Sequence, residues 1–76
     1  MGKLGKNHDR VLLLQTAIKL NDANPSYYRN LGSAYYSLQS YELACEKYDK
    51  AIKIEPDNLL NYHNKGSALL KLEKYE

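Results

Sequence analysis

The chain has 76 residues, of which 43% are hydrophobic and 26% are charged, and its formal net charge is +2. A chain of this length folds as one small domain, near the size at which a single core is only marginally stable. Acidic and basic residues are intermixed, which argues against nucleic acid or a membrane as a partner. The single cysteine excludes an internal disulfide, and the absence of a signal peptide or long apolar run predicts a cytoplasmic location.

The N-terminal end of the chain lacks hydrophobic periodicity, so we expect residues 1–6 to form a flexible leader. Asn7 is then an expected N-cap, because its side chain can accept hydrogen bonds from free helix amides. An apolar face that includes Val11 and Leu14 follows at helical spacing. These features predict a first helix over residues 7–21.

Local start signals predict where the later helices begin. Asn24 can cap a second helix, and Pro25 suits the first helical position because it has no N–H group to leave unpaired. Ser40 can cap a third helix in the same way. Apolar residues recur at the spacing of one helix face after each signal, and again after Asn58. The predicted helices cover residues 25–38, 41–54 and 59–73.

The chain repeats itself when it is shifted by thirty-four residues. The residues that coincide include Gly32 with Gly66, Ser33 with Ser67, Tyr28 with Tyr62, and Asn30 with Asn64. Self-similarity at a fixed period of this length is typical of proteins built from stacked helical units. The sequence therefore predicts a helical repeat protein.

One stretch within this period resembles the tetratricopeptide repeat (TPR) signature, in which an aromatic residue, Leu-Gly, Tyr, Ala, an aromatic residue and Pro recur at fixed spacing. The residues that carry the resemblance are Tyr28, Leu31, Gly32, Tyr35, Ala44, Tyr48 and Pro56. The resemblance implies an all-α fold, an α-solenoid fragment of four helices in which sequence neighbours pack antiparallel. It also implies the second helix of a partial repeat, one complete repeat, and the first helix of a partial repeat, at residues 7–24, 25–58 and 59–76.

Gly32 lies in the middle of a predicted helix, where glycine costs about 1 kcal/mol relative to alanine. Close packing of two helices explains this residue better than a flexible hinge does. The partial repeats depart from the signature, because Lys65 stands at the Leu position and Arg10 at the small Ala position. A long charged side chain fits a closed interior poorly, so we expect looser packing near both ends of the chain.

The sequence offers little for catalysis or for binding a metal or cofactor. His8 and His63 are far apart, and neither has a Cys, Asp or Glu at a spacing that resembles a zinc or hydrolase motif. Cys45 follows the packing residue Ala44, so the role of a small helical filler is favoured for it over that of a nucleophile. We therefore predict that the protein is not an enzyme and uses no cofactor or metal.

The resemblance implies a scaffold that binds proteins, because TPR arrays line a concave groove with the first helix of each pair and hold an extended peptide or a partner helix there. By register with the family, the candidate groove residues are Arg29, Asn30, Ser33, Tyr36, Leu60, His63, Asn64, Ser67 and Lys71. In such grooves an asparagine at the position of Asn30 and Asn64 often hydrogen-bonds the ligand backbone. A solvated helical asparagine is the alternative for both residues.

An acidic C-terminal tail is the first ligand to test, because Arg29, His63 and Lys71 would give the groove a basic rim. Arg29 and Asn64 also match part of the carboxylate clamp with which some TPR domains grip the acidic tails of cytosolic chaperones. Ser33 stands where that clamp has Asn, and the remaining basic residues of the clamp would belong to a further repeat. A solvated basic rim is the favoured alternative.

The same division into repeats allows a second function, in which the chain is a structural unit that associates head to tail. The first and last predicted helices would each leave an apolar face without a partner. Pairing the fourth helix of one copy with the first helix of another would restore a repeat and produce a homo-oligomer. The candidate residues are Val11, Leu14 and Ile18 at one end, and Tyr62, Leu69, Leu70 and Leu72 at the other.

Overall fold

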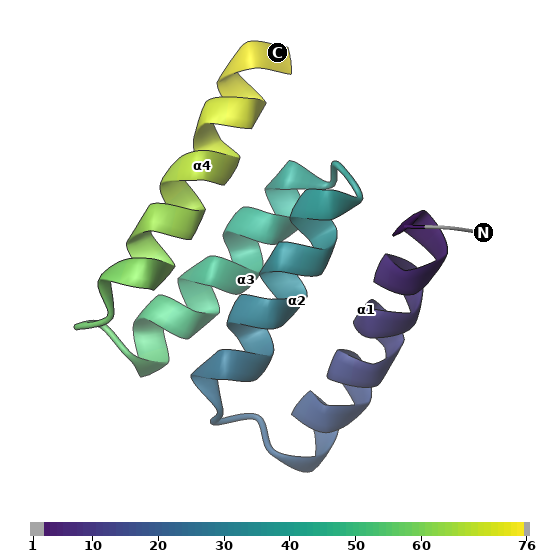
Figure 1. The fold of residues 1–76 in the computed structure, drawn as a ribbon. Helices are drawn as coiled ribbons and strands as arrows, with labels where there is room; N and C mark the ends of the chain where they lie inside the picture. Colours follow the sequence, from purple (N-terminus) through teal and green to yellow (C-terminus); the bar gives the residue numbers. More distant parts are fainter. Residues whose placement is uncertain (1–2, 76) are drawn as a thin grey trace.

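Four α-helices form the fold in a computed structural model that describes residues 3–75 (Figure 1). They are α1 (Lys3–Leu20), α2 (Pro25–Ser37), α3 (Tyr41–Ile54) and α4 (Leu59–Tyr75), and no strand occurs between residues 3 and 75. The predicted all-α fold is confirmed. The bounds of α2, α3 and α4 lie within two residues of those expected.

The helices lie side by side in chain order, and each runs antiparallel to the one before it (Figure 1). The molecule is flat, with principal extents of 33 × 33 × 15 Å. Within the described range α1 packs on α2 alone, whereas α3 lies between α2 and α4, which touch each other only slightly. A single layer of helices leaves both of its faces open to solvent, so side chains on either face are available to a partner.

Two asparagines at equivalent repeat positions start α2 and α4. The Asn24 side-chain oxygen accepts a hydrogen bond from the Ser26 N–H at 2.9 Å, and the Asn58 side-chain oxygen accepts one from the Leu60 N–H at 3.0 Å. Each bond satisfies an amide that the helix leaves unpaired. The predicted cap at Asn24 is confirmed. Ser40 occupies the N-cap position of α3, but its side chain makes no cap hydrogen bond.

The turn between α2 and α3 holds the one non-glycine residue with a positive φ in the described part of the chain, Gln39 at 64°. The Ser40 N–H donates to the Tyr35 carbonyl at 2.9 Å, and the Gln39 N–H donates to the Tyr36 carbonyl at 3.0 Å. These bonds satisfy carbonyls at the end of α2, which is the usual role of a left-handed residue there. Glu73, the repeat equivalent of Gln39, is helical, so this position ends α2 but not α4.

The core consists of small residues packed around a few large side chains. Its apolar members are Tyr28, Leu31, Ala34, Ala44, Cys45, Tyr48, Ala51 and Ala68. The alanines let the helix backbones approach closely, because they add little bulk between them. Gly32 of α2 lies against the Tyr48 ring of α3, and a Cβ atom built on Gly32 would stand 2.6 Å from that ring. Close packing therefore explains Gly32, as predicted.

The first helix begins earlier than expected. α1 starts at Lys3, so residues 3–6 of the expected leader are helical, and Met1 and Gly2 lie outside the described residues. Asn7 is not an N-cap, because it lies inside α1, where its side-chain oxygen accepts a hydrogen bond from Arg10 Nη1 at 3.4 Å. Two lysines and a leucine among residues 3–6 are good helix formers, and lengthening a helix that has already formed is less costly than starting one, although Gly5 opposes it.

Lys65, which replaces the signature leucine, is accommodated by an ion pair between α4 and α3. Its Nζ lies 2.6 Å from the Asp49 Oδ1, and the Lys65 side chain is 35% exposed. The hydrogen bond to Asp49 raises the pKa of Lys65 above its ordinary value. The lysine thus extends its charged end out of the interior to a carboxylate on the surface.

Candidate functional site

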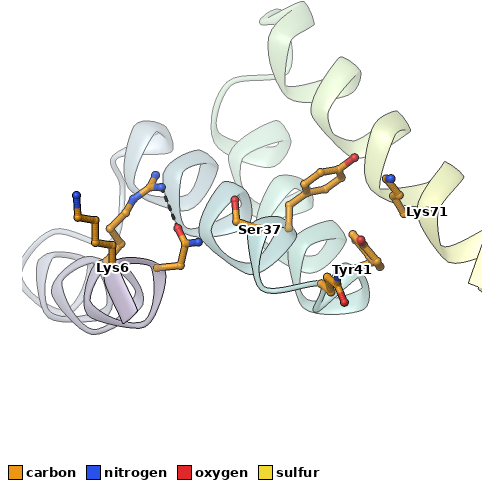
Figure 2. Close-up of a pocket in the computed structure, with 8 residues that line it drawn as sticks. Lys6, Ser37, Tyr41 and Lys71 are labelled. Carbon is orange, nitrogen blue, oxygen red and sulfur yellow. Dashed lines mark hydrogen bonds between the residues drawn. The ribbon is translucent and has the colours of Figure 1, made fainter. Parts of the chain in front are cut away.

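Three adjoining hollows lie around Tyr36, near the C-terminal end of α2, and we call them together the Tyr36 groove. The largest has a volume of about 670 Å³. It is lined by Lys6, Asn7, Arg10, Tyr36, Ser37, Gln39, Tyr41 and Lys71. Figure 2 shows Ser37 between Lys6 of α1 and Lys71 of α4, so this hollow reaches from one outer helix toward the other.

The other two hollows lie mainly between α2 and α4. One, of about 260 Å³, is lined by Ser33, Tyr36, Ser37, Tyr48, Asn64 and Ser67. The other, of about 330 Å³, is lined by Tyr36, Ser67, Leu70, Lys71, Glu73 and Lys74. The three hollows adjoin at Tyr36, which lines all of them, and they place hydroxyl and amide groups beside apolar surface.

The largest hollow is basic. Lys6, Arg10 and Lys71 line it, and no acidic residue does. Among the side chains that the structure describes, none of these three cations forms an ion pair with a carboxylate. Uncompensated cations along one hollow attract an anionic group, and salt weakens the attraction because the hollow is open to solvent.

Three tyrosine side chains line the groove, those of Tyr36, Tyr41 and Tyr48. The rings of Tyr36 and Tyr41 pack edge to face, with centroids 5.3 Å apart and an interplanar angle of 74°. The Tyr48 hydroxyl lies 3.3 Å from the Ser33 Oγ. Burial raises the pKa of Tyr48 above the ordinary value of 10.0. A phenol is protonated at neutral pH with or without this shift, so the hydroxyl can donate a hydrogen bond.

A family model described as TPR repeat matches residues 32–73, which is more than half of the chain. The chain belongs to the TPR family. TPR repeats generally mediate interactions between proteins, and they typically act as scaffolds without catalytic activity. A search of curated proteins found no match to the chain.

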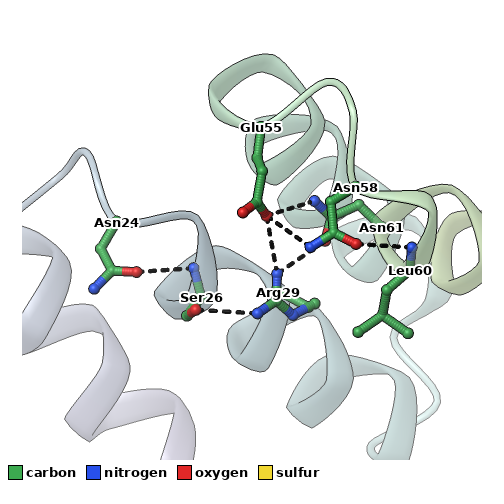
Figure 3. Close-up of polar contacts among 7 residues, drawn as sticks. All are labelled: Asn24, Ser26, Arg29, Glu55, Asn58, Leu60 and Asn61. Atoms are coloured by element: carbon green, nitrogen blue, oxygen red, sulfur yellow. Dashed lines mark hydrogen bonds and ion pairs between the residues drawn. The ribbon is translucent and has the colours of Figure 1, made fainter.

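Arg29 was expected in the TPR groove, but it is bound at the other end of α2. Its Nη1 donates to Glu55 Oε1 and to Asn61 Oδ1, both at 3.3 Å, and its Nη2 donates to Ser26 Oγ at 3.0 Å (Figure 3). This network joins the start of α2 to the end of α3 and the start of α4. The sequence predicts a basic rim that includes Arg29, and in this structure its charge is paired with the Glu55 carboxylate.

The network depends on a buried residue that the sequence pattern does not single out. Asn61 is 0% exposed, and its Nδ2 donates to Glu55 Oε1 at 3.4 Å. Asn58 Nδ2 donates to the same oxygen at 2.9 Å. The repeat equivalent of Asn61 is Tyr27, so the thirty-four-residue period contains no signal for a buried amide here. Only the tertiary fold brings Asn61 to Arg29.

The structure brings part of the candidate TPR groove together. The candidates that line the Tyr36 groove are Ser33, Tyr36, Asn64, Ser67 and Lys71. Asn30, Leu60 and His63 are exposed and line none of its three hollows. Lys6 and Arg10 also line it, although the sequence pattern assigns one to a leader and the other to a packing position. No local signal predicts that these two cations reach the groove.

The self-association candidates on α4 divide into exposed and packed side chains. Tyr62, Leu69 and Leu70 are exposed, at 45%, 48% and 63%. Leu72 packs against the core that α3 and α4 share, which corrects the expectation that it is bare. Its position one helical turn after Ala68, a fully buried residue, explains why it faces inward.

The candidates on α1 also differ from the expectation. The three that were expected to be bare are half-buried, because α1 packs on α2: they are Val11, Leu14 and Ile18. The large exposed apolar residues of α1 are Leu12, Leu13 and Leu20. An apolar surface is therefore present on α1, but it is made mostly by other leucines than those predicted.

The described residues also bear on metal binding, membrane crossing and cysteine reactivity. Between residues 3 and 75 no group of three or more His, Cys, Asp or Glu side chains is placed to hold a metal ion. In the same range no helix combines the length and apolar character that crossing a membrane requires. Cys45 is buried, and burial and then the charge of Asp49 raise the pKa of its thiol, which disfavours the thiolate.

Proposed function

We propose that the chain is a protein-interaction scaffold that binds an extended peptide segment of a partner in the Tyr36 groove. The observation that carries this proposal is that three hollows adjoin at Tyr36 and are lined by polar groups from α2 and α4. A bound peptide needs partners for its backbone N–H and C=O groups, because an unpaired polar group is costly once water is excluded. The groove supplies such partners along its length.

Asn64, Ser33 and Ser67 are the groups that we assign to the peptide backbone. All three are half-buried and line the hollow of about 260 Å³. An amide side chain both donates and accepts, so Asn64 can pair with the N–H and the C=O of a peptide. Tyr36 and Leu70 then offer apolar surface to a side chain of the ligand.

An acidic C-terminal tail is the ligand class that we propose first. Lys6, Arg10 and Lys71 line the largest hollow, and no acidic residue lines it. These cations take the role that the sequence pattern assigns to Arg29, whose charge is paired with Glu55. Surface ion pairs contribute about 0.2–1 kcal/mol each, so the cations select a charged ligand rather than supply most of its affinity.

Fluorescence anisotropy with a labelled acidic peptide tests the ligand class. The peptide ends in a free carboxylate, and one control is the same peptide with an amidated C-terminus. A second control has Asn and Gln in place of Asp and Glu. We expect both controls to bind more weakly, and binding of the acidic peptide to weaken as salt is raised. Equal binding of all three peptides would remove the assignment of an acidic ligand.

Two matched asparagine variants test the groove itself. Asn64→Ala removes a side chain that lines the groove, whereas Asn30→Ala removes an exposed asparagine at the equivalent repeat position. Loss of one hydrogen bond corresponds to about 0.5–1.5 kcal/mol, so we expect Asn64→Ala to weaken binding about two- to tenfold. Asn30→Ala should have a smaller effect. A bound peptide that is indifferent to both changes lies elsewhere on the surface.

Two broader expectations from the sequence stay predictions. The first is a cytoplasmic location, which cell fractionation would test. The second is the lack of a nucleic-acid partner, which a labelled duplex in the same anisotropy experiment would test. Tight, salt-sensitive binding of that duplex would contradict the second expectation.

A further inference from the structure

Two helices at equivalent repeat positions, α2 and α4, are covered to different extents. Tyr28 of α2 is 7% exposed, whereas its equivalent Tyr62 of α4 is 45% exposed. A Cβ atom on Gly32 would meet the Tyr48 ring of α3, whereas a Cβ atom on Gly66 would meet no described atom within 4 Å. The face of α4 that corresponds to the α3-contact face of α2 is therefore open in this structure.

The helix that fits this face by sequence is α1, because a shift of thirty-four residues places α1 on α3. Leu14 then takes the position of Tyr48, and Ala17 takes that of a fully buried alanine of α3. Leu13 and Leu20 of α1 are exposed, at 70% and 84%. They lie along one side of α1 with Leu14 and Ala17, since residues three, four and seven apart share a helix face.

We propose that α4 of one copy docks on α1 of a second copy, in the register that α2 and α3 use within one chain. In this register Leu14 of the second copy lies over Gly66 of the first. Tyr62 and Leu69 flank Gly66 along α4, and both are exposed in the single chain. A second copy is the occupant that the observations favour, because the α2–α3 interface of the chain itself supplies the geometry.

The interface joins two different surfaces, so it is heterologous and allows either a closed ring or an open stack. Arg10 stands where α3 has Ala44, so its long side chain must extend past the junction rather than pack within it. Leu14 also fills less space than Tyr48 does. The contact is therefore weaker than the one between α2 and α3, and association depends on protein concentration.

Light scattering between about 10 µM and about 1 mM protein measures this association. We expect the molar mass of the wild-type chain to rise with concentration, and Leu69→Glu to abolish the rise because it places a charge at the junction. Leu43→Glu is the matched control, since Leu43 is similarly exposed, at 40%, but lies on α3. A wild-type chain that stays monomeric throughout, or an equal loss in both variants, overturns the proposal.

Mixing two blocked variants tests the head-to-tail geometry. Leu69→Glu blocks α4 and leaves α1 free, whereas Leu13→Glu blocks α1 and leaves α4 free. Each variant alone should be monomeric and fully helical by circular dichroism, and the mixture should form a one-to-one dimer. Dimers of Leu13→Glu alone would indicate pairing of α4 with α4, and dimers of Leu69→Glu alone would indicate pairing of α1 with α1. Either result contradicts the proposed geometry.

Gly66→Leu tests the register. The open space beside Gly66 accepts a side chain in the single chain, so helix content should not change. In the assembly the same side chain would collide with Leu14 of the second copy. We expect association to weaken by about tenfold or more, as overpacked contacts do. Association that is unchanged or stronger in this variant rules the register out.

Discussion

Gly32 and Tyr48 set the distance between α2 and α3, because a Cβ atom on Gly32 would lie 2.6 Å from Cε1 of the Tyr48 ring. The ring has little room to move aside, since Tyr48 is 3% exposed. We expect Gly32→Ala to lower the free energy of unfolding by about 1–3 kcal/mol, the usual range for an overpacked core. Urea denaturation followed by circular dichroism measures this change.

Gly66→Ala is the matched control for that substitution, because both glycines are helical and occupy equivalent repeat positions. A Cβ atom on Gly66 meets open space, so alanine should raise the free energy of unfolding by up to about 1 kcal/mol through its better helix propensity. The measurement uses protein dilute enough to be monomeric. If alanine stabilises the chain at both positions, the contact between Gly32 and Tyr48 is not tight.

Asn61 stabilises the meeting point of three helices, because its buried amide bonds both Arg29 and Glu55. Asn61→Ala leaves these charged groups with fewer partners, so we expect the free energy of unfolding to fall by about 1–3 kcal/mol. The bonds of 3.3 and 3.4 Å are long, which favours the lower end of that range. Asn64→Ala, at a half-buried position of the same helix, should cost less. The reverse order of the two thermal midpoints would argue against the network.

The ion pair between Lys65 and Asp49 predicts a pH dependence at alkaline pH. The hydrogen bond to Asp49 raises the pKa of Lys65 in the folded chain above 10.5. The ion pair therefore contributes its full stabilisation of the folded chain below pH 10.5. That contribution is lost as the pH rises through the folded-state pKa of Lys65. We expect Lys65→Leu, which restores the signature residue, to lose less stability than the wild type between about pH 8 and about pH 11.

Urea denaturation of both proteins at the two pH values measures that difference. Both proteins carry Cys45→Ala, because the charge of Lys65 lowers the pKa of that thiol, and the comparison then isolates the contribution of the ion pair. The Lys65 side chain is 35% exposed, and solvent therefore screens much of its interaction with the carboxylate. Equal alkaline losses in the wild type and the variant would show that the pair adds no stability.

Cys45 should react slowly in the folded chain, because it is buried and its pKa is raised by burial and then by the charge of Asp49. We expect an aromatic disulfide reagent to modify Cys45 quickly only after urea unfolds the protein. Ser37→Cys in a Cys45→Ala background is the control, since Ser37 is exposed. Similar native-state rates for the two cysteines would contradict the burial of Cys45.

Much of the fold follows from local signals in the sequence. Asn24 and Pro25 mark the start of α2, and Gly32 predicts the close approach of α3, because each depends on groups that are neighbours in one helix or one helical pair. The position of Gln39 shows where such signals stop. It is left-handed at the end of α2, while its equivalent Glu73 continues α4, so the local pattern alone does not decide where these helices end.

The candidate site is less predictable because it depends on contacts between helices distant in sequence. The family register predicts Asn64 and Tyr36 as groove residues, and both line the Tyr36 groove. The same register predicts Arg29 as a groove residue, but its side chain is bound by Glu55 and by the buried amide of Asn61. The repeat pattern indicates neither contact. Lys6 lines the groove because α1 extends further toward the N-terminus than its apolar periodicity does.

The dependence of α1 on a single neighbour gives the chain a gradient of local stability. Because α1 packs on α2 alone in the described structure, it can open without disturbing the contacts of α3 and α4. Its backbone amides should therefore exchange with deuterium through a partial opening, while those of α3 exchange only on global unfolding. Lys6 and Arg10 lie on this least protected helix and also line the largest hollow. A ligand bound there would slow exchange throughout α1, including amides far from the ligand, because detachment of the helix would first require release of the ligand.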